Sequence, residues 1–286
     1  ENLVDYNLSE SGVHPMRVDE LVDDPADRAG LLTQELLYTQ SNGTVELRER
    51  IAALYPGATP DHVEVTNGGS EANFVTLWHL LEPGDQVVMM VPNYGQTLGL
   101  VEGFGGDLRP WPLHMTVDGR RWVVDLDHLR ALVTPKTRMI VICNPNNPTG
   151  ARISAAALDG ICQIAAKYGA WVLSDEIYRG AEFDGVETAS VWDRYERAII
   201  TSGLSKAYGL PGLRIGWIVS APPVVAATWA HHDYTTIGPG ALSDRLARHA
   251  LTPAVRARIL QRTRRILTSN LPVMTEAELR DSIQWE

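Results

Sequence analysis

The sequence is poor in cysteine, in phenylalanine and in long apolar runs. Among 286 residues there are three Phe and two Cys, Cys143 and Cys162, each within an apolar stretch. Two cysteines cannot form the framework of a disulfide-rich secreted scaffold, so we expect both to be buried free thiols in a reducing compartment, the cytoplasm. The apolar run 87–91 is far shorter than the roughly 20 residues that cross a bilayer, and the acidic start of the chain lacks the apolar region of a signal peptide.

Positive charge is also scarce. Lys and Arg number 25 against 35 Asp and Glu, a formal net charge of −10 at pH 7. This field repels phosphate backbones and anionic lipid surfaces, so we expect neither nucleic acid nor a membrane as a partner. A small phosphate ligand is still compatible with it, because a few backbone amides and one Arg can hold such a group locally.

Short apolar runs alternate with segments of helical period from about residue 60 onward. This alternation predicts an α/β domain with a mostly parallel sheet flanked by helices. The expected organisation is an arm over residues 1–30, the sheet domain over 31–222 and a helical segment over 223–286. We expect strands at 62–66, 86–91, 107–112, 137–143, 170–174, 198–202 and 213–219, and helices at 70–81, 95–104, 126–133 and 154–168.

Polar segments follow several of the predicted strands. The strand 62–66 leads into NGGSEAN (67–73) and a helix, where backbone amides at a helix N-terminus form a cradle for an anion. NPNNPTG (144–150) and DEIYR (175–179) end two further strands. In an open α/β sheet, ligands bind at the carboxyl ends of the strands. Taken singly, each segment is also typical of an ordinary turn or helix cap.

The segment SGLSKAYGLPGLRIGW (202–217) places Lys206 after a strand, among small and apolar residues, with Arg214 eight positions later. Most lysines in proteins are exposed and solvated. An amine in an apolar pocket near other cations is more readily deprotonated, which is the condition for attack on a carbonyl and imine formation. Lys206 is therefore the candidate nucleophile.

In this order the four segments resemble the class I/II aminotransferase family, the pyridoxal-phosphate enzymes of fold type I. The resemblance covers about residues 38–217, and NPNNPTG together with the Lys206–Arg214 spacing is its most specific part. It implies the large domain of that fold, with pyridoxal 5′-phosphate as cofactor. The implied reaction moves an amino group between an amino acid and a 2-oxo acid.

The resemblance also assigns roles around the cofactor ring. Lys206 matches the lysine that forms an imine with the cofactor aldehyde and later moves the proton of the substrate Cα. Asp175 matches the carboxylate that keeps the pyridine nitrogen protonated, so that the ring draws electrons. Tyr178 and Asn147 match the residues that hydrogen-bond the 3′ oxygen. Tyr94 matches the aromatic residue that stacks on the ring face.

Further roles concern the phosphate. Gly69 and Ser70 match the amide cradle, Arg214 its counter-charge, and Ser202 or Ser205 a hydroxyl donor. The resemblance leaves the choice between the two serines open.

Tyr38 matches a tyrosine that reaches the phosphate of the neighbouring subunit. The resemblance therefore implies a homodimer with a shared active site.

The family binds the substrate α-carboxylate through an Arg in a small carboxyl-terminal domain. Only residues 218–286 follow Trp217, and they have the pattern of helices without strands. We expect this domain to be truncated or absent, which fits a fragment, a shortened member that compensates, or a protein that binds the cofactor without efficient catalysis. The arginines between 256 and 265 predict a solvated helix face.

The segment NLSESGVHP (7–15) lies where this family has a substrate-side loop. Gly12 would permit a close backbone approach there, and His14 could touch substrate. SGVH and LSKAYGLPGLRIGW are also similar to a specialised-metabolism subgroup that includes capreomycidine synthase, which uses the same cofactor for elimination and ring closure. Two alternatives to transamination thus stay open: elimination or cyclisation, as in a C–S lyase or that subgroup, and a non-catalytic cofactor-binding module.

The run His231-His232-Asp233 does not predict a metal site. Adjacent residues point to different sides of a helix, and no further ligand stands at a spacing that would join them.

Overall fold

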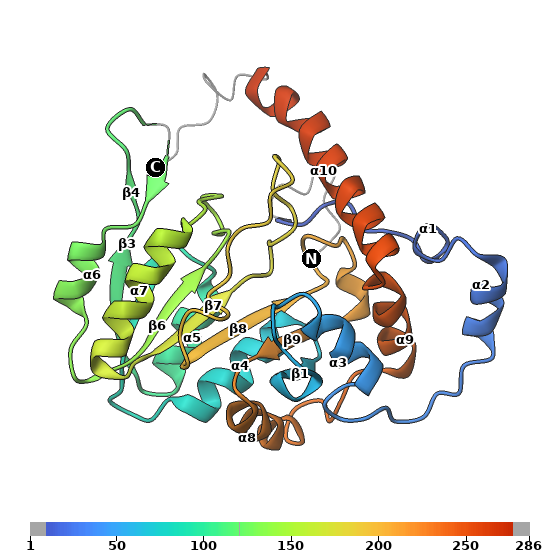
Figure 1. Cartoon of the computed structure of the whole chain (residues 1–286), viewed down its shortest axis with the longest axis horizontal. Helices are drawn as coiled ribbons and strands as arrows, with labels where there is room; N and C mark the ends of the chain where they lie inside the picture. Colours follow the sequence, from blue (N-terminus) through green and yellow to red (C-terminus); the bar gives the residue numbers. More distant parts are fainter. Residues whose placement is uncertain (1–9, 120, 277–286) are drawn as a thin grey trace.

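A seven-stranded sheet forms the centre of the molecule (Figure 1). The computed structural model describes residues 10–119 and 121–276. Within the sheet, β9 runs antiparallel to both of its neighbours and the remaining neighbours pair in parallel, which confirms the expected α/β architecture with a mostly parallel sheet. The strands, in their spatial order, are β1 (Val63–Thr66), β9 (Gly216–Val219), β8 (Ala198–Gly203), β7 (Trp171–Asp175), β6 (Thr137–Cys143), β2 (Gln86–Val91) and β3 (Asp107–Pro112).

Helices bury both faces of the sheet. Along β2, Val87 and Met89 pack into one apolar cluster and Val88 and Met90 into the other, as the alternation of side chains along a strand requires. The first cluster is closed by α4 (Gly69–Leu80), α5 (Gly95–Gly103) and α8 (Pro222–His232). The second is closed by α3 (Val45–Ala52), α6 (Leu126–Leu132), α7 (Ala155–Tyr168), α9 (Ala241–Ala250) and α10 (Pro253–Glu276).

The ranges expected from the sequence include none of the first three helices: α1 (Val18–Leu21), α2 (Pro25–Leu32) and α3. They also lack the two-stranded hairpin β4 (His114–Met115) and β5 (Trp122–Val123), and the 3₁₀ turns η1 (Pro60–His62) and η2 (Pro211–Leu213). The strand expected at 213–219 begins only at Gly216, because η2 and a left-handed Arg214 precede it. Figure 1 shows α2 at the right margin, with an extended segment leading from it back to α3. Residues 7–9 of the predicted substrate-side loop and 277–286 of the carboxyl-terminal segment lie outside the described residues.

The helices beyond Pro222 are present as expected, but the arginines of α10 do not form a simple solvated face. Arg256 donates to the Tyr208 hydroxyl at 3.0 Å, and Arg262 donates to the main-chain carbonyl of His14 at 3.0 Å. These side chains bind α10 to the loop after Lys206 and to the amino-terminal segment. The expectation was wrong because helical periodicity does not reveal which distant segments cover a helix.

Both cysteines are buried free thiols, as predicted. Among residues 10–119 and 121–276, no helix combines the length and apolar character needed to cross a membrane.

Candidate active site

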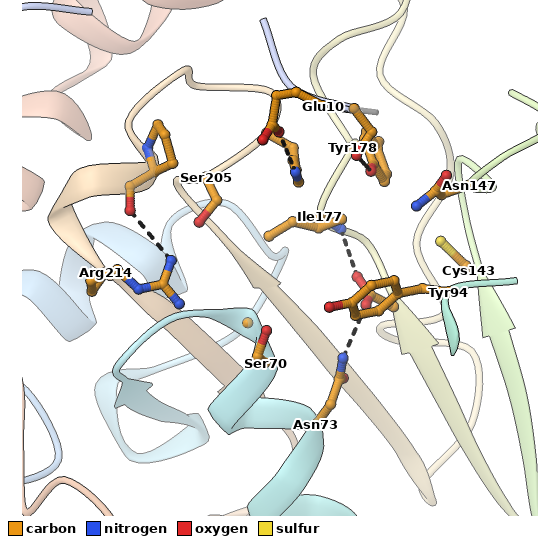
Figure 2. Close-up of a pocket in the computed structure, with 15 residues that line it drawn as sticks. Glu10, Ser70, Asn73, Tyr94, Cys143, Asn147, Ile177, Tyr178, Ser205 and Arg214 are labelled. Atoms are coloured by element: carbon orange, nitrogen blue, oxygen red, sulfur yellow. Dashed lines mark hydrogen bonds and ion pairs between the residues drawn. The ribbon is translucent and has the colours of Figure 1, made fainter. Parts of the chain in front are cut away.

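A cavity of about 480 Å³ opens at the carboxyl edge of the sheet (Figure 2). Loops that follow β1, β2, β6, β7 and β8 line it, because parallel strands end at the same edge. Arg214 joins them from the start of β9, since the amino end of an antiparallel strand lies at that same edge. The lining residues are Glu10, Ser11, Gly69, Ser70, Asn73, Tyr94, Cys143, Asn147, Asp175, Ile177, Tyr178, Ser205, Lys206, Pro211 and Arg214.

The structure therefore brings together most of the predicted site residues. Gly69, Ser70, Tyr94, Asn147, Asp175, Tyr178, Ser205, Lys206 and Arg214 all line this cavity. Figure 2 shows Arg214, Ser205 and Ser70 toward one end, with Tyr178 and Asn147 toward the other.

Asp175 is the last residue of β7 and is held from two directions. Its Oδ2 accepts a hydrogen bond from Asn73 Nδ2 at 3.1 Å, and its Oδ1 accepts one from the Ile177 amide at 3.0 Å. Burial raises the pKa of Asp175, and these two hydrogen bonds partly oppose the rise. A buried carboxylate of this kind is stabilised most by a cation placed next to it in the cavity.

Lys206 is paired with the amino-terminal segment. Its Nζ lies 2.8 Å from Oε1 of Glu10, and its side chain is 26% exposed. The hydrogen bond from Lys206 holds the pKa of Glu10 below its ordinary value. The expectation of an apolar pocket around this lysine is therefore wrong, because a carboxylate contacts its amine. The correction comes from a contact 196 positions away in the chain, which no local pattern reveals.

Tyr178 and Asn147 present polar groups at the other end of the cavity. The Tyr178 hydroxyl lies 2.8 Å from Ser11 Oγ, and burial raises the pKa of Tyr178 to about 12 despite that hydrogen bond. Tyr178 therefore stays protonated at neutral pH and can donate to an oxygen in the cavity. Asn147 points into the same space from the loop after β6 (Figure 2).

The amide cradle at the start of α4 depends on a close approach between the backbone at Gly68 and the guanidinium of Arg214. Gly68 precedes α4 with φ of +91°, and a Cβ there would lie 2.2 Å from Nη2 of Arg214. Arg214 itself adopts a left-handed φ of +50°, which is uncommon outside glycine and is typical of functional loops. The first N–H groups of a helix have no intrahelical acceptor, so those of Gly69 and Ser70 can bind an anion beside the guanidinium.

The structure distinguishes between the two candidate serines. Ser205 lines the cavity. Ser202 is buried, and its hydroxyl donates to the Glu176 carbonyl at 3.1 Å instead. The geometry therefore favours Ser205 as the hydroxyl donor.

The remaining predicted residues lie outside the cavity lining. Gly12 packs against Lys206, since a Cβ on it would be 3.7 Å from Lys206 Cδ. His14 is exposed, and its carbonyl accepts from Arg262. Tyr38 is 85% exposed on the extended segment before α3. The substrate contacts predicted for Gly12 and His14 stay predictions.

Sequence reasoning missed six lining residues: Glu10, Ser11, Asn73, Cys143, Ile177 and Pro211. For Asn73 a signal existed, because it lies three residues after Ser70 on the same helix face. Its Oδ1 accepts from the Thr201 hydroxyl at 2.7 Å, which orients its amide toward Asp175. Glu10 and Ser11 lie within the segment 7–15 that was placed at a substrate-side loop, but their own contacts depend on how this segment crosses the cavity.

Gly216→Ala is expected to destabilise the fold by about 1–3 kcal/mol, since overpacking forces backbone shifts of that cost. The added Cβ would lie 2.3 Å from the Gly68 carbonyl carbon and 2.4 Å from the Gly69 nitrogen. The measurement is denaturant-induced unfolding. Gly212→Ala is the matched control, because a Cβ at that position meets nothing within 4 Å. Equal stability of the two variants would contradict the close approach of β9 to the cradle.

Comparison with known proteins agrees with this geometry. Residues 7–279 match the sequence profile described as aminotransferase class I and II. The chain belongs to this family. Capreomycidine synthase of Streptomyces vinaceus is 35% identical over 253 residues, which are 87% of this chain and 64% of that protein. Aspartate aminotransferase of Thermotoga maritima is 30% identical over 209 residues, 71% of this chain and 55% of that protein.

Solved structures of the family share the fold. A PLP-dependent aminotransferase from Streptococcus suis 89-1591 superposes with a TM-score of 0.86 at 34% identity, covering 93% of this chain and 71% of that one. Aspartate aminotransferase from Thermus thermophilus with maleate gives a TM-score of 0.81 at 27% identity, covering 88% and 67%. These likenesses confirm the resemblance and the fold. The chain spans less than two thirds of the length of the two curated relatives above.

Proposed function

We propose that this chain is a pyridoxal-phosphate-dependent aminotransferase that moves an amino group between an amino acid and a 2-oxo acid. The observation that carries the proposal is the meeting of Lys206, Asp175 and the cradle at Gly69 in a single cavity at the carboxyl edge of the sheet. Membership of the family supports it. Neither fold nor family specifies the substrate.

The residues present fit pyridoxal phosphate. A volume of about 480 Å³ is in the range of small-ligand sites. The space beside Gly68, which a Cβ would fill, leaves room for Arg214 to reach the cradle. Burial raises the pKa of Asp175, and a protonated pyridine nitrogen beside it would favour its ionised form. When bound, the cofactor supplies an electron sink for the bonds of the substrate Cα.

The side chains would then divide the work around the cofactor. Lys206 would bind the aldehyde carbon and, once released, would take and return the proton at the substrate Cα. Asp175 would hold its negative charge against the ring nitrogen. Tyr178 and Asn147 would donate hydrogen bonds to the ring oxygen, and Tyr94 would cover the ring. The cradle, Ser205 and Arg214 would bind the phosphate.

The experiment that tests this function is a half-reaction screen by absorbance. The purified chain, supplied with pyridoxal phosphate, is mixed with single amino acids, and formation of pyridoxamine phosphate with the matching 2-oxo acid is measured. Transamination predicts both products in equal amounts. A bound chromophore that no amino acid perturbs would contradict the proposal and favour a non-catalytic module.

A second candidate is favoured by the 35% identity to capreomycidine synthase. Elimination or ring closure would use the same residues around the cofactor, because it too begins with removal of the substrate Cα proton. It differs in the next step, in which a group leaves the substrate side chain and no proton is returned to the cofactor. Release of ammonia, or of a cyclised product, without a 2-oxo acid acceptor would support this candidate.

We further propose a homodimer with a shared site. Leu32, Leu36 and Tyr38 are 90%, 80% and 85% exposed within residues 32–38, and covering such apolar side chains by a second subunit would be favourable. The predicted position of Tyr38 at the neighbouring phosphate would bury it there.

For this assembly, light scattering is expected to give twice the 31.5 kDa chain mass. Tyr38→Phe is expected to weaken pyridoxal phosphate binding about tenfold through loss of one hydrogen bond to a charged group. Tyr234→Phe, which changes another exposed tyrosine, is the control. A monomer that binds the cofactor equally well with Phe at position 38 would contradict the shared site.

A further inference from the structure

A buried ion cluster lies behind the amino end of α4, outside the cavity lining. His232, the last residue of α8, has no exposed side-chain surface. Its Nε2 lies 3.0 Å from Oε2 of Glu71, in the first turn of α4, and its Nδ1 lies 3.6 Å from Oε1 of Glu64 on β1. Glu64 is fully buried as well. Analysis of the sequence did not predict this cluster, because Glu71 precedes His232 by 161 positions.

An imidazolium at His232 satisfies both carboxyl groups of the cluster. Within the described part of the chain, Glu64 Oε1 and His232 Nδ1 are buried without a hydrogen-bond partner, and they face each other. A neutral imidazole donates at one nitrogen, so it serves one carboxylate, whereas an imidazolium directs an N–H at each. No group of His, Cys, Asp or Glu in residues 10–119 and 121–276 is arranged to hold a metal ion in its place.

The titration of the cluster is consistent with this charge state. Burial alone would lower the pKa of His232, but the hydrogen bond and charge of Glu71, with the charges of Glu64 and Asp233, raise it above the ordinary value. Burial would also raise the pKa of Glu71, but the hydrogen bond from His232 and other donors hold it at about 2. Burial raises the pKa of Glu64 to about 7. Glu71 is therefore the ionised partner of the histidine at neutral pH.

Glu71 connects this cluster to the phosphate cradle. Its carboxylate accepts the Asn67 N–H at 2.5 Å and the Thr236 hydroxyl at 2.9 Å. The carbonyl of Asn67 in turn accepts from Nη2 of Arg214 at 3.4 Å. The residue that precedes Gly68 is thus fixed on one side by the buried cluster and on the other by the arginine that faces the cavity.

The charge of Glu71 would by itself oppose the function of the cradle. A carboxylate in the first turn of α4 repels a phosphate bound at the same helix end, although it suits the helix dipole when no phosphate is present. With His232 protonated the pair is neutral, and Glu71 can hold Asn67 without repelling the ligand. A histidine in the neutral form, or an uncharged substitute, would leave that repulsion uncompensated.

We propose that His232 and Glu71 are positioning residues for the phosphate cradle: the imidazolium neutralises Glu71, and Glu71 holds the Asn67 amide that orients Gly68, Gly69 and Ser70. This network sets the affinity for phosphorylated ring ligands without touching them. The inference rests on the proposed function, because it assumes that the cavity binds a phosphorylated pyridine.

The test compares two non-reactive ligands, 4-deoxypyridoxine 5′-phosphate and 4-deoxypyridoxine, by calorimetric titration of the ligand-free full chain. Neither has an aldehyde, so neither bonds to Lys206, and the ratio of their Kd values isolates the contribution of the phosphate. His232→Gln is expected to weaken the phosphorylated ligand about tenfold and the other less than about twofold. His231→Gln, which alters the adjacent ring on the same helix, is the control and is expected to leave the ratio unchanged.

A second substitution that rescues binding distinguishes the loss of a positioning role from general damage to the fold. Glu71→Gln keeps an oxygen acceptor for Asn67 but removes the charge, so adding it to His232→Gln is expected to restore the ratio to within about threefold of wild type. If His232→Gln does not fold, Glu71→Ala replaces it. This variant loses the acceptor and is expected to weaken the phosphorylated ligand about tenfold relative to the unphosphorylated one, while Glu71→Gln alone keeps the wild-type ratio.

An equal loss for both ligands, an unchanged ratio, or a double variant as defective as the single one would overturn the inference. A wild-type chain that binds neither ligand would instead overturn the proposed function. The two failures are therefore distinguishable.

Discussion

Lys206→Ala is expected to abolish covalent attachment of pyridoxal phosphate and to lower turnover at least about a thousandfold, because both the nucleophile and the group that carries the Cα proton are lost. The phosphate cradle and Arg214 remain in this variant, so the cofactor is still expected to bind, but without a covalent bond to the chain. Stopped-flow absorbance of the half-reaction measures the loss. The expected record is a bound chromophore that responds slowly or not at all to amino acids.

The control for this variant is Lys167→Ala, which removes a lysine located on α7, away from the cavity lining. It is expected to leave the half-reaction unchanged. Turnover at the wild-type rate in Lys206→Ala would remove this residue from its assigned role.

Asp175→Asn is expected to lower the rate of proton removal from the substrate Cα about 10²–10⁴-fold, the range of a lost acid–base contribution. Asparagine keeps the size of the side chain and a hydrogen bond to Asn73, but it has no charge to keep a ring nitrogen protonated. Loss of Cα deuterium from a labelled amino acid, followed in a single turnover, measures this step. Asp61→Asn, an exposed aspartate, is the control, and an unchanged rate at position 175 would contradict the assignment.

The same variant has an opposite expected effect on stability. Because burial raises the pKa of Asp175 in the folded chain, the folded state holds this proton more tightly than the unfolded state does. Stability therefore falls as pH rises from the unfolded pKa through the folded one, and at neutral pH the ionised side chain destabilises the ligand-free protein. Asp175→Asn is expected to raise Tm without ligand. A lower Tm would mean that Asn73 and Ile177 already compensate the charge.

Local patterns predicted the parts of the site that follow strands. The apolar run at 137–143 coincides with β6, and the side chains after β6, β7 and β8 meet because those strands are parallel neighbours. Asn147, Asp175 and Lys206 could therefore be placed at one edge from the sequence. Their roles remain predictions that the experiments above test.

Contacts between distant segments could not be predicted in this way. The pairing of Glu10 with Lys206 depends on the path of the amino-terminal segment, and the ion cluster at His232 depends on how α8 packs beside α4. The direction of β9 was also unknown, so the route by which Arg214 reaches the cradle became visible only in the fold. The division of the chain into an arm, a sheet domain and a helical segment stays a prediction.

The most direct test of the account is chemical trapping. The chain is incubated with excess pyridoxal phosphate and reduced with borohydride, and its peptides are then analysed by mass spectrometry. The sequence contains only the lysines Lys136, Lys167 and Lys206, so the modified peptide identifies the site without ambiguity. The account predicts a stable phosphopyridoxyl group on Lys206, and an unmodified Lys206, with or without modification of the other two lysines, would contradict it.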